Sequence, residues 1–243
     1  MNLLTPHQKK IYQEQDVILS ALKRIRPFPY ILSGGTALSR FYSHHRFSED
    51  LDFFCEEMTF SFEKIEGIVQ KLRKTGMICE VIGKSDQPGR LMAVSYVICP
   101  PSYRHPIKID FLEDPFSGMW KPESRSTESG LSFRIDAIDQ IYYRKFFSLL
   151  EQWHRTHGIN RIKDLIDIYA LHQYHRSIEQ TVGLFRKNHV PLDEEKMIMI
   201  LGSISKKEIS EHLAVLTTSF EANVIWKTLK QSSENMLKKG LSR

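Results

Sequence analysis

The spacing of apolar residues predicts a long amphipathic helix near the start of the chain. Apolar side chains recur at helical intervals, at Ile11, Ile18, Leu22 and Ile25. Thr5 and Pro6 are favoured at the cap and at the first position of a helix, so we expect the helix to begin there. Pro27 and Pro29 should end it.

Short apolar or alternating segments then predict a sheet interrupted by two helices. The expected strands are residues 30–32, 50–54, 77–82, 91–98 and 107–112, and the expected helices are residues 36–42 and 62–72. Gly76 closes the second of these helices. This order of elements favours a mixed sheet over a purely parallel one.

Residues 115–130 are rich in Pro, Gly and Ser, and the pattern beyond Arg134 is helical. We expect helices over about residues 136–152 and 161–172. The pattern therefore predicts an α+β protein with an N-terminal mixed-sheet domain, residues 1–130, followed by a C-terminal helical domain, residues 131–243.

Composition is that of an ordinary globular protein. The 243 residues carry a formal charge of +5, an excess that is compatible with a nucleic-acid partner without requiring one. Three scattered cysteines without C-x-x-C spacing favour neither a disulfide framework nor a zinc site. No secretory leader and no apolar stretch of membrane-spanning length is found, so we expect a soluble cytoplasmic protein with no membrane partner.

A glycine pair and a carboxylate pair follow one another along the predicted sheet. Gly34-Gly35 allows a tight turn that exposes backbone N–H groups at the start of a helix, where a phosphate can bind. Asp50 and Asp52 lie two residues apart in a strand-like segment, so both carboxylates should leave the same face. Together they predict a nucleotide site.

Neighbouring carboxylates repel each other and need a cation to remain ionised. Mg²⁺, or Mn²⁺ in its place, binds carboxylate and phosphate oxygens together, and a pair of such ions supports phosphoryl transfer. The alternative for Asp50 and Asp52 is a solvated turn at the end of a strand.

Asp110 is a candidate third metal ligand. The alternation in residues 107–112 places Lys108 and Asp110 on one face and the apolar residues on the other. Asp110 can then face the Asp50/Asp52 strand. The alternative is a surface pair between Lys108 and Asp110.

Two further candidates lie on predicted helices of the second half. Lys145 could act as a point-charge clamp on a triphosphate. Asp167 lies four residues after Lys163, so a solvated helix salt bridge competes with any catalytic role for it. His154 and His157 read as loop residues, because two histidines without a further ligand make a poor metal site.

These blocks resemble the AbiEii/AbiGii-type nucleotidyltransferase toxins of the DNA polymerase β-like superfamily. The matching blocks are Gly34-Gly35-Thr36-Ala37-Leu38, Arg46-Phe47-Ser48-Glu49-Asp50-Leu51-Asp52-Phe53-Phe54, Lys145, and Lys163-Asp164-Leu165-Ile166-Asp167-Ile168. The likeness runs from about residue 30 to residue 171. The chain has Lys163-Asp164 where the family usually has Arg-Asp, and a longer stretch before it.

The resemblance implies a mixed-sheet nucleotidyltransferase domain followed by a helical domain, with the nucleotide between them. It assigns the triphosphate to Gly34, Gly35 and Ser48, with Thr36 in the same motif, and the metal to Asp50 and Asp52. It further implies that Lys145 contacts the phosphates and that Asp167 has a catalytic or nucleotide-positioning role.

The expected function is Mg²⁺-dependent transfer of a nucleotide from an NTP to RNA, with tRNA as the leading acceptor. The family resemblance adds the role of a toxin in a bacterial toxin–antitoxin or phage-defence system, with a cognate antitoxin as partner. One alternative is transfer to a protein or small molecule. Another is a non-catalytic nucleotide-binding protein acting through a partner, and a helix-turn-helix regulator is disfavoured because no compact basic helix is found.

Overall fold

The computed structural model describes residues 4–56, 60–87, 90–101, 105–114, 116, 119–156 and 161–240. The chain divides into two compact units, Met1–Ile138 and Asp139–Arg243, and each is described by itself. The first unit contains a mixed sheet with helices, and the second is helical.

The described strands of the first unit form one seven-stranded sheet in the order β3-β4-β5-β2-β1-β7-β6. The strands are β1 (Ile31–Ser33), β2 (Leu51–Glu56), β3 (Ile78–Gln87), β4 (Arg90–Cys99), β5 (Ile107–Asp114), β6 (Glu123–Ser126) and β7 (Ser132–Ile135). The pairs β2–β5 and β1–β7 are parallel and the other pairs are antiparallel. The predicted α+β class with a mixed sheet is therefore confirmed.

One face of this sheet is an aromatic core. Phe53 and Phe111 stack with ring centroids 5.7 Å apart, and Tyr30 meets Phe111 at 4.9 Å. Because side chains alternate along a strand, the residues between these aromatics point to the other face. The aromatic face thus fixes where Asp52 and Asp110 point.

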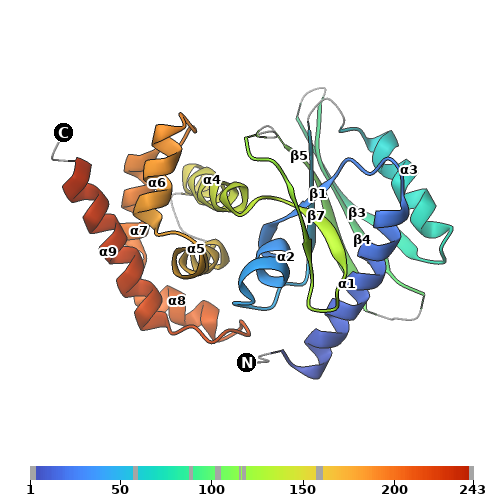
Figure 1. Ribbon diagram of the computed structural model, residues 1–243, viewed down its shortest axis with the longest axis horizontal. Coiled ribbons are helices and arrows are strands. Elements are labelled where there is room, and N and C mark those ends of the chain that lie inside the picture. The colour runs from blue at the N-terminus through green and yellow to red at the C-terminus, as the bar shows by residue number, and fades with distance from the viewer. Residues whose placement is uncertain are drawn as a thin grey trace. The chain divides into compact units, whose positions relative to one another are not determined.

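Helices α1 (Pro6–Arg24) and α3 (Phe62–Arg73) lie on one side of the sheet, as Figure 1 shows. The hydroxyl of Tyr96 on β4 donates to Glu66 Oε2 on α3 at 2.8 Å, which identifies this side as the aromatic face. Both predicted helix starts are confirmed. Thr5 and Gln8 form a capping box on α1, and the predicted helix over 62–72 is capped by Ser61.

The helix after the glycine pair has two parts. Residues Gly34–Leu38 form α2, which continues as a π-helix, η1, over Ser39–Ser43. The sequence predicts one regular helix over residues 36–42. The helix begins at the glycine pair itself, so Gly34 and Gly35 belong to its first turn.

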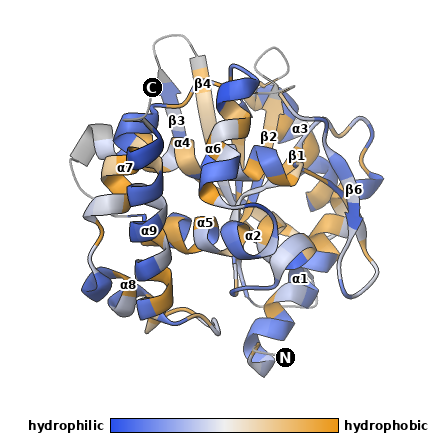
Figure 2. Ribbon diagram, turned by 60° about the vertical axis from the view of Figure 1, so that its left-hand side comes forward, coloured by the Kyte–Doolittle hydropathy of each residue, from blue (hydrophilic) through white to orange (hydrophobic). Residues whose placement is uncertain are grey.

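Strands β6 and β7 are absent from the sequence prediction. β6 is polar along its length, as Figure 2 shows, and most of its side chains are exposed, so it lacks the alternation that signals a strand. β7 is only four residues long and pairs with β1 through Leu32 and Ile135. A boundary at residue 130 would separate β7 from the sheet to which it belongs.

The second unit consists of helices in its described residues. They are α4 (Ile138–Thr156), α5 (Ile162–Tyr174), α6 (Ile178–Lys187), α7 (Glu194–Ser203), α8 (Lys206–Leu213) and α9 (Ala222–Gly240). Helix α5 is buried over residues 164–171, including both of its aspartates. The sequence places Asp164 and Asp167 on a polar side of this helix, and their burial corrects that expectation.

Cys55, Cys79 and Cys99 are all free thiols. Within the described residues, no helix combines the length and apolar character that crossing a membrane requires.

Candidate active site

The turn after β1 places the backbone of Gly34 against Asp52. Gly34 has φ +70°, a conformation that strongly favours glycine. A Cβ at Gly34 would overlap Oδ2 of Asp52 and lie 2.9 Å from its Cγ. Ser33 and Asp52 are register partners on β1 and β2, which explains this closeness. The glycine is therefore required both by the turn and by the carboxylate beside it.

Gly35 lies beside Ser48 and Arg46. A Cβ at Gly35 would overlap the guanidinium of Arg46 and would lie 2.9 Å from Ser48 Oγ. The guanidinium is largely buried, and its Nη1 donates to the Phe47 carbonyl at 3.0 Å. Arg46 therefore places a positive charge next to the glycine turn. The sequence analysis named this residue within a motif and gave it no role.

The loop before β2 is held by α1. Gln15 is fully buried, and its Nε2 donates to the carbonyls of Glu49 at 2.7 Å and Ser48 at 3.2 Å. The Ser48 N–H donates to the Tyr12 hydroxyl at 3.3 Å. Burial raises the pKa of Tyr12, so this hydroxyl stays neutral near pH 7. The loop is therefore fixed by buried polar side chains.

Thr36 and Asp50 are joined within this loop. The Thr36 side chain is fully buried, and its hydroxyl donates to the backbone carbonyl of Asp50. Asp50 itself is exposed and lies immediately before β2, outside the strand in which the sequence places it. Thr36 thus positions the backbone that carries the Asp50 carboxylate.

Asp52 and Asp110 lie side by side in the sheet. They are register partners on the parallel strands β2 and β5, so their side chains leave the same face, opposite the aromatic core. Asp110 Oδ1 is buried and has no hydrogen-bond partner. The expectation that Asp110 faces the strand of Asp52 agrees with this register.

Ser33 extends the same row of polar residues. It pairs with Asp52 across β1 and β2, is fully buried, and has a hydroxyl with no hydrogen-bond partner. Two unsatisfied oxygens, Ser33 Oγ and Asp110 Oδ1, therefore flank Asp52 along the sheet. The sequence analysis missed Ser33, although its position directly before the glycine pair was the available signal.

Lys108 contributes a positive charge to this face. Its ammonium donates to Asp110 Oδ2, so the pair that the sequence offered as an alternative also forms. Burial opposes the charged form of Lys108, but the bond to Asp110 and the charges of Asp110, Asp50 and Asp52 raise its pKa above the ordinary value. Lys108 is therefore charged and lies within electrostatic reach of all three carboxylates.

The described residues contain no group of three or more His, Cys, Asp or Glu side chains already arranged around one metal position. Asp52 and Asp110 nevertheless fit a hard divalent cation, because both are carboxylates on paired strand positions and Asp110 Oδ1 lacks a partner.

A second charged cluster lies within the helical unit. Lys145 Nζ on α4 is 2.7 Å from Asp164 Oδ1 and 2.7 Å from Asp167 Oδ2, both on α5. The Ser148 hydroxyl donates to Asp164 Oδ2 at 3.0 Å, and Arg161 Nε lies 2.9 Å from the same oxygen. The structure thus joins Lys145 to Asp167, as well as to Asp164, for which the sequence suggested no role.

The proposed helix salt bridge between Lys163 and Asp167 is absent. Lys163 is exposed, whereas the Asp167 side chain is 0% exposed and pairs with Lys145. Because Asp167 has no exposed surface, it can affect a bound ligand only by positioning Lys145. His154 belongs to α4, so its interpretation as a loop residue is wrong, and His157 lies outside the described residues.

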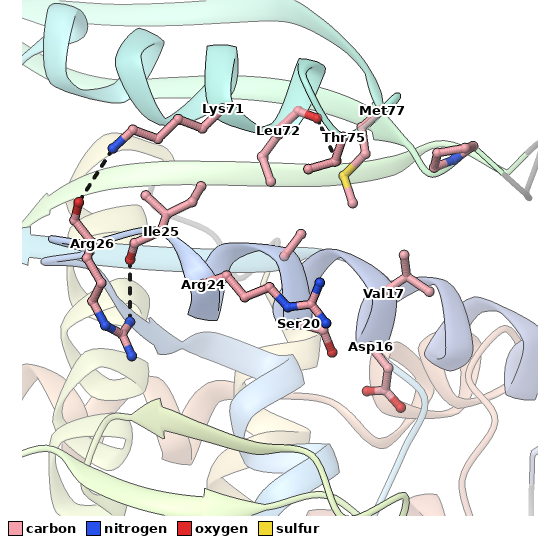
Figure 3. A pocket seen from close by; sticks show the side chains of 12 residues that line it. Asp16, Val17, Ser20, Arg24, Ile25, Arg26, Lys71, Leu72, Thr75 and Met77 are labelled. Carbon is pink, nitrogen blue, oxygen red and sulfur yellow. Dashed lines mark hydrogen bonds between the residues drawn. The ribbon is translucent and has the colours of Figure 1, made fainter.

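A hollow of about 890 Å³ lies between α1 and α3, as Figure 3 shows. Its lining includes Arg24, Arg26 and Lys71 around an apolar floor, and it contains none of the candidate site residues. Because α1 and α3 cover the aromatic face, this hollow lies on the face opposite Asp52 and Asp110.

The family model of the AbiEii toxin, described as a nucleotidyl transferase of a type IV toxin–antitoxin system, matches residues 21–239. The chain belongs to the AbiEii nucleotidyltransferase family. The match spans both units, which agrees with the blocks that the sequence analysis identified. This AbiEii family member is therefore an enzyme of the nucleotidyltransferase class, and the family implies a toxin–antitoxin setting with an antitoxin as partner.

Two solved structures from Helicobacter pylori share the fold. A candidate nucleotidyltransferase is 18% identical with a TM-score of 0.61, and the match covers 97% of each chain. The protein JHP933 is also 18% identical with a TM-score of 0.60, covering 97% of this chain and 94% of its own. No match was found among curated proteins.

Proposed function

We propose that this AbiEii family member is a Mg²⁺-dependent enzyme that transfers a nucleotide from an NTP to an RNA acceptor, with tRNA as the favoured acceptor. The observation that carries the proposal is the register pairing of Asp52 with Asp110 beside the Gly34 turn. Binding of a donor nucleotide requires both parts: the glycine turn binds phosphate, and the carboxylates bind the metal.

In this proposal the triphosphate binds at the start of α2. The backbone of Gly34 and Gly35 and the Ser48 hydroxyl bind the phosphates, and the buried Arg46 guanidinium adds positive charge beside Gly35. Ser33 Oγ, which has no partner in the structure, supplies a further hydrogen bond. Thr36 supports the same site by holding the Asp50 backbone.

Asp50, Asp52 and Asp110 would hold the divalent ions. Bound Mg²⁺, or Mn²⁺ in its place, would offset the charge of the carboxylates and the triphosphate and lower the pKa of the acceptor hydroxyl. The protein's part is to place the carboxylates correctly. The Gln15 and Thr36 hydrogen bonds to the loop before β2 do so for Asp50.

Lys145 and Asp167 enter this proposal as a coupled pair. Lys145 is the charged group that would act on the phosphates, and the two buried carboxylates of Asp164 and Asp167 fix its ammonium. Asp167 has no exposed surface, so its role is to position Lys145.

The acceptor is the least constrained part of the proposal, because the sheet residues bind the donor. The net charge of +5 favours a polyanionic acceptor such as RNA over a neutral small molecule. Transfer to a protein, including the chain itself, is the second candidate and is an outcome of the same test.

The test is to incubate the purified protein with Mg²⁺, each α-labelled NTP in turn, and either total tRNA or total protein. We expect label to enter tRNA for the wild type, and not for an Asp52→Asn variant that is folded equally well. If label enters protein and not tRNA, the acceptor is a protein and the RNA acceptor is wrong. If neither tRNA nor protein is labelled with any NTP, the proposed reaction is contradicted.

A further inference from the structure

Asp110 is only half satisfied in the structure. Its Oδ2 accepts from Lys108, whereas its Oδ1 is buried and has no hydrogen-bond partner. A buried carboxylate oxygen left without a partner costs free energy. Lys108 therefore pairs with one oxygen of Asp110 and leaves the other without a partner.

Lys108 also lies within electrostatic reach of the other two carboxylates. The charges of Asp50 and Asp52 act on its ammonium together with that of Asp110. Without a nearby positive charge, these carboxylates would repel one another. In the metal-free protein, Lys108 thus provides positive charge that a divalent ion would otherwise supply.

The Lys108 side chain is free to leave this position. It is 40% exposed, against 11% for Lys145, whose ammonium is held by two buried carboxylates. A lysine has a long flexible stem and a strongly hydrated head, so moving its ammonium from a partly exposed pair into water costs little.

We infer that Lys108 is a displaceable counter-ion: in the metal-free protein its ammonium pairs with Asp110 and offsets the negative charge of Asp52 and Asp50, and it leaves when a divalent cation binds. This inference rests on the proposed metal site and adds to it a residue that competes with the metal.

The inference makes Lys108 a positioning residue with two opposite effects. Removing its charge should lower the stability of the metal-free protein, because the carboxylates then repel one another. The same change should strengthen metal binding, because the cation no longer has to displace an ion pair. An exposed lysine that does not interact with the metal site would produce neither effect.

The test is a titration of the purified full chain with Mn²⁺, following free Mn²⁺ by electron paramagnetic resonance. Lys108→Met should bind Mn²⁺ about tenfold more tightly than the wild type, the scale expected for one charge-assisted hydrogen bond. Lys108→Arg keeps the charge and should remain close to the wild type. Lys64→Met, which removes an exposed charge on α3, controls for the change in net charge.

Thermal unfolding gives a second measurement that does not depend on catalysis. Without metal, Lys108→Met should unfold at a lower temperature than the wild type. Saturating Mn²⁺ should raise the Tm of Lys108→Met by more than it raises the Tm of the wild type or of Lys64→Met.

The controls separate failure of this inference from failure of the metal site. If the wild type binds Mn²⁺, Asp52→Asn does not, and Lys108→Met binds no more tightly than Lys64→Met, then Lys108 is not a competing counter-ion and the metal site stands. If Lys108→Met binds Mn²⁺ more weakly than the wild type, the inference is wrong in sign. If no variant binds Mn²⁺, the proposed metal site and this inference fail together.

Discussion

Lys145 and Asp167 form an ion pair of 2.7 Å in which the carboxylate has no exposed surface. Asp164 lies 2.7 Å from the same ammonium, and Arg161 Nε lies 2.9 Å from its other oxygen, so Lys145 is shared by two buried carboxylates. Breaking a buried pair by removing one partner leaves an uncompensated charge, which is strongly destabilising. These residues therefore determine the stability of the helical unit as well as any action on phosphate.

We expect Lys145→Ala to lower the free energy of unfolding by about 3–5 kcal/mol, since it removes the buried cation that Asp164 and Asp167 share. Urea denaturation followed by circular dichroism measures this change. Lys163→Ala removes an exposed lysine of the same helix as Asp167 and should change the value by less than about 0.5 kcal/mol. Equal effects of the two variants would contradict the buried-pair interpretation.

Asp50→Ala and Asp52→Ala should each reduce nucleotidyl transfer by about a hundredfold or more, the scale of losing one group that stabilises charge in an active site. Both side chains are at least partly exposed, so the folded state should survive, as thermal unfolding can check.

Asp110→Asn should reduce transfer in the same assay, because an amide is a weaker ligand than a carboxylate. Near-normal turnover with unchanged Tm would exclude these residues from the metal site.

Gly34→Ala should reduce transfer by about a hundredfold, because displacement of a reacting group by roughly 1 Å has effects of this size. The added Cβ would overlap the Asp52 carboxylate, and φ +70° disfavours any residue with a Cβ. Gly67→Ala is the matched control. Gly67 lies within α3, a Cβ there meets nothing within 4 Å, and the change should stabilise the helix by about 0.5–1 kcal/mol with activity intact.

Stability should fall as the pH drops below neutrality, in part through His172. Burial lowers the pKa of His172, and its Nδ1 accepts a hydrogen bond from the Ile178 N–H at 3.3 Å, so the folded state favours the neutral ring. The unfolded chain binds this proton at a higher pH than the folded one. The contribution of His172 is therefore complete above about pH 6.5, its unfolded pKa, and shrinks as the pH falls toward the lowered folded value.

His172→Asn keeps a hydrogen-bond acceptor but has no proton to gain. Unfolding free energies measured between pH 5 and pH 8 should fall less steeply on acidification for this variant than for the wild type. Parallel curves for the two proteins would show that His172 makes no pH-dependent contribution.

If the family's toxin role applies to this chain, induced expression in a bacterium should arrest growth. Asp52→Asn should relieve the arrest at equal protein level, since it removes a proposed metal ligand without emptying the core. Growth curves and immunoblots of the same cultures measure both quantities. Arrest by the inactive variant would mean that growth is inhibited by something other than nucleotidyl transfer.

The sequence by itself determined most of the elements of the first unit and its α+β class, and it predicted the chemistry of a site. Alternation at Phe53 and Phe111 predicted which face is buried, and the spacing of Gly34, Asp52 and Asp110 predicted a nucleotide site on that sheet. Such patterns are local, because the two-residue period of a strand fixes which side chains share a face. β6 escaped prediction because it is polar along its length, and β7 because its alternation extends over only four residues.

Only the tertiary structure decided which charges meet. The spacing of Lys163 and Asp167 along α5 allowed a solvated pair as an alternative, but packing of α5 among other helices buries Asp167 and brings Lys145 to it from α4. Likewise, spacing left Asp110 open between a metal ligand facing Asp52 and a surface partner of Lys108, and in the structure Asp110 both pairs with Lys108 and lies beside Asp52. Charges far apart in the chain meet only when packing brings their helices or strands together. A pair buried in this way is stronger than a local surface pair, because water no longer competes for the charges.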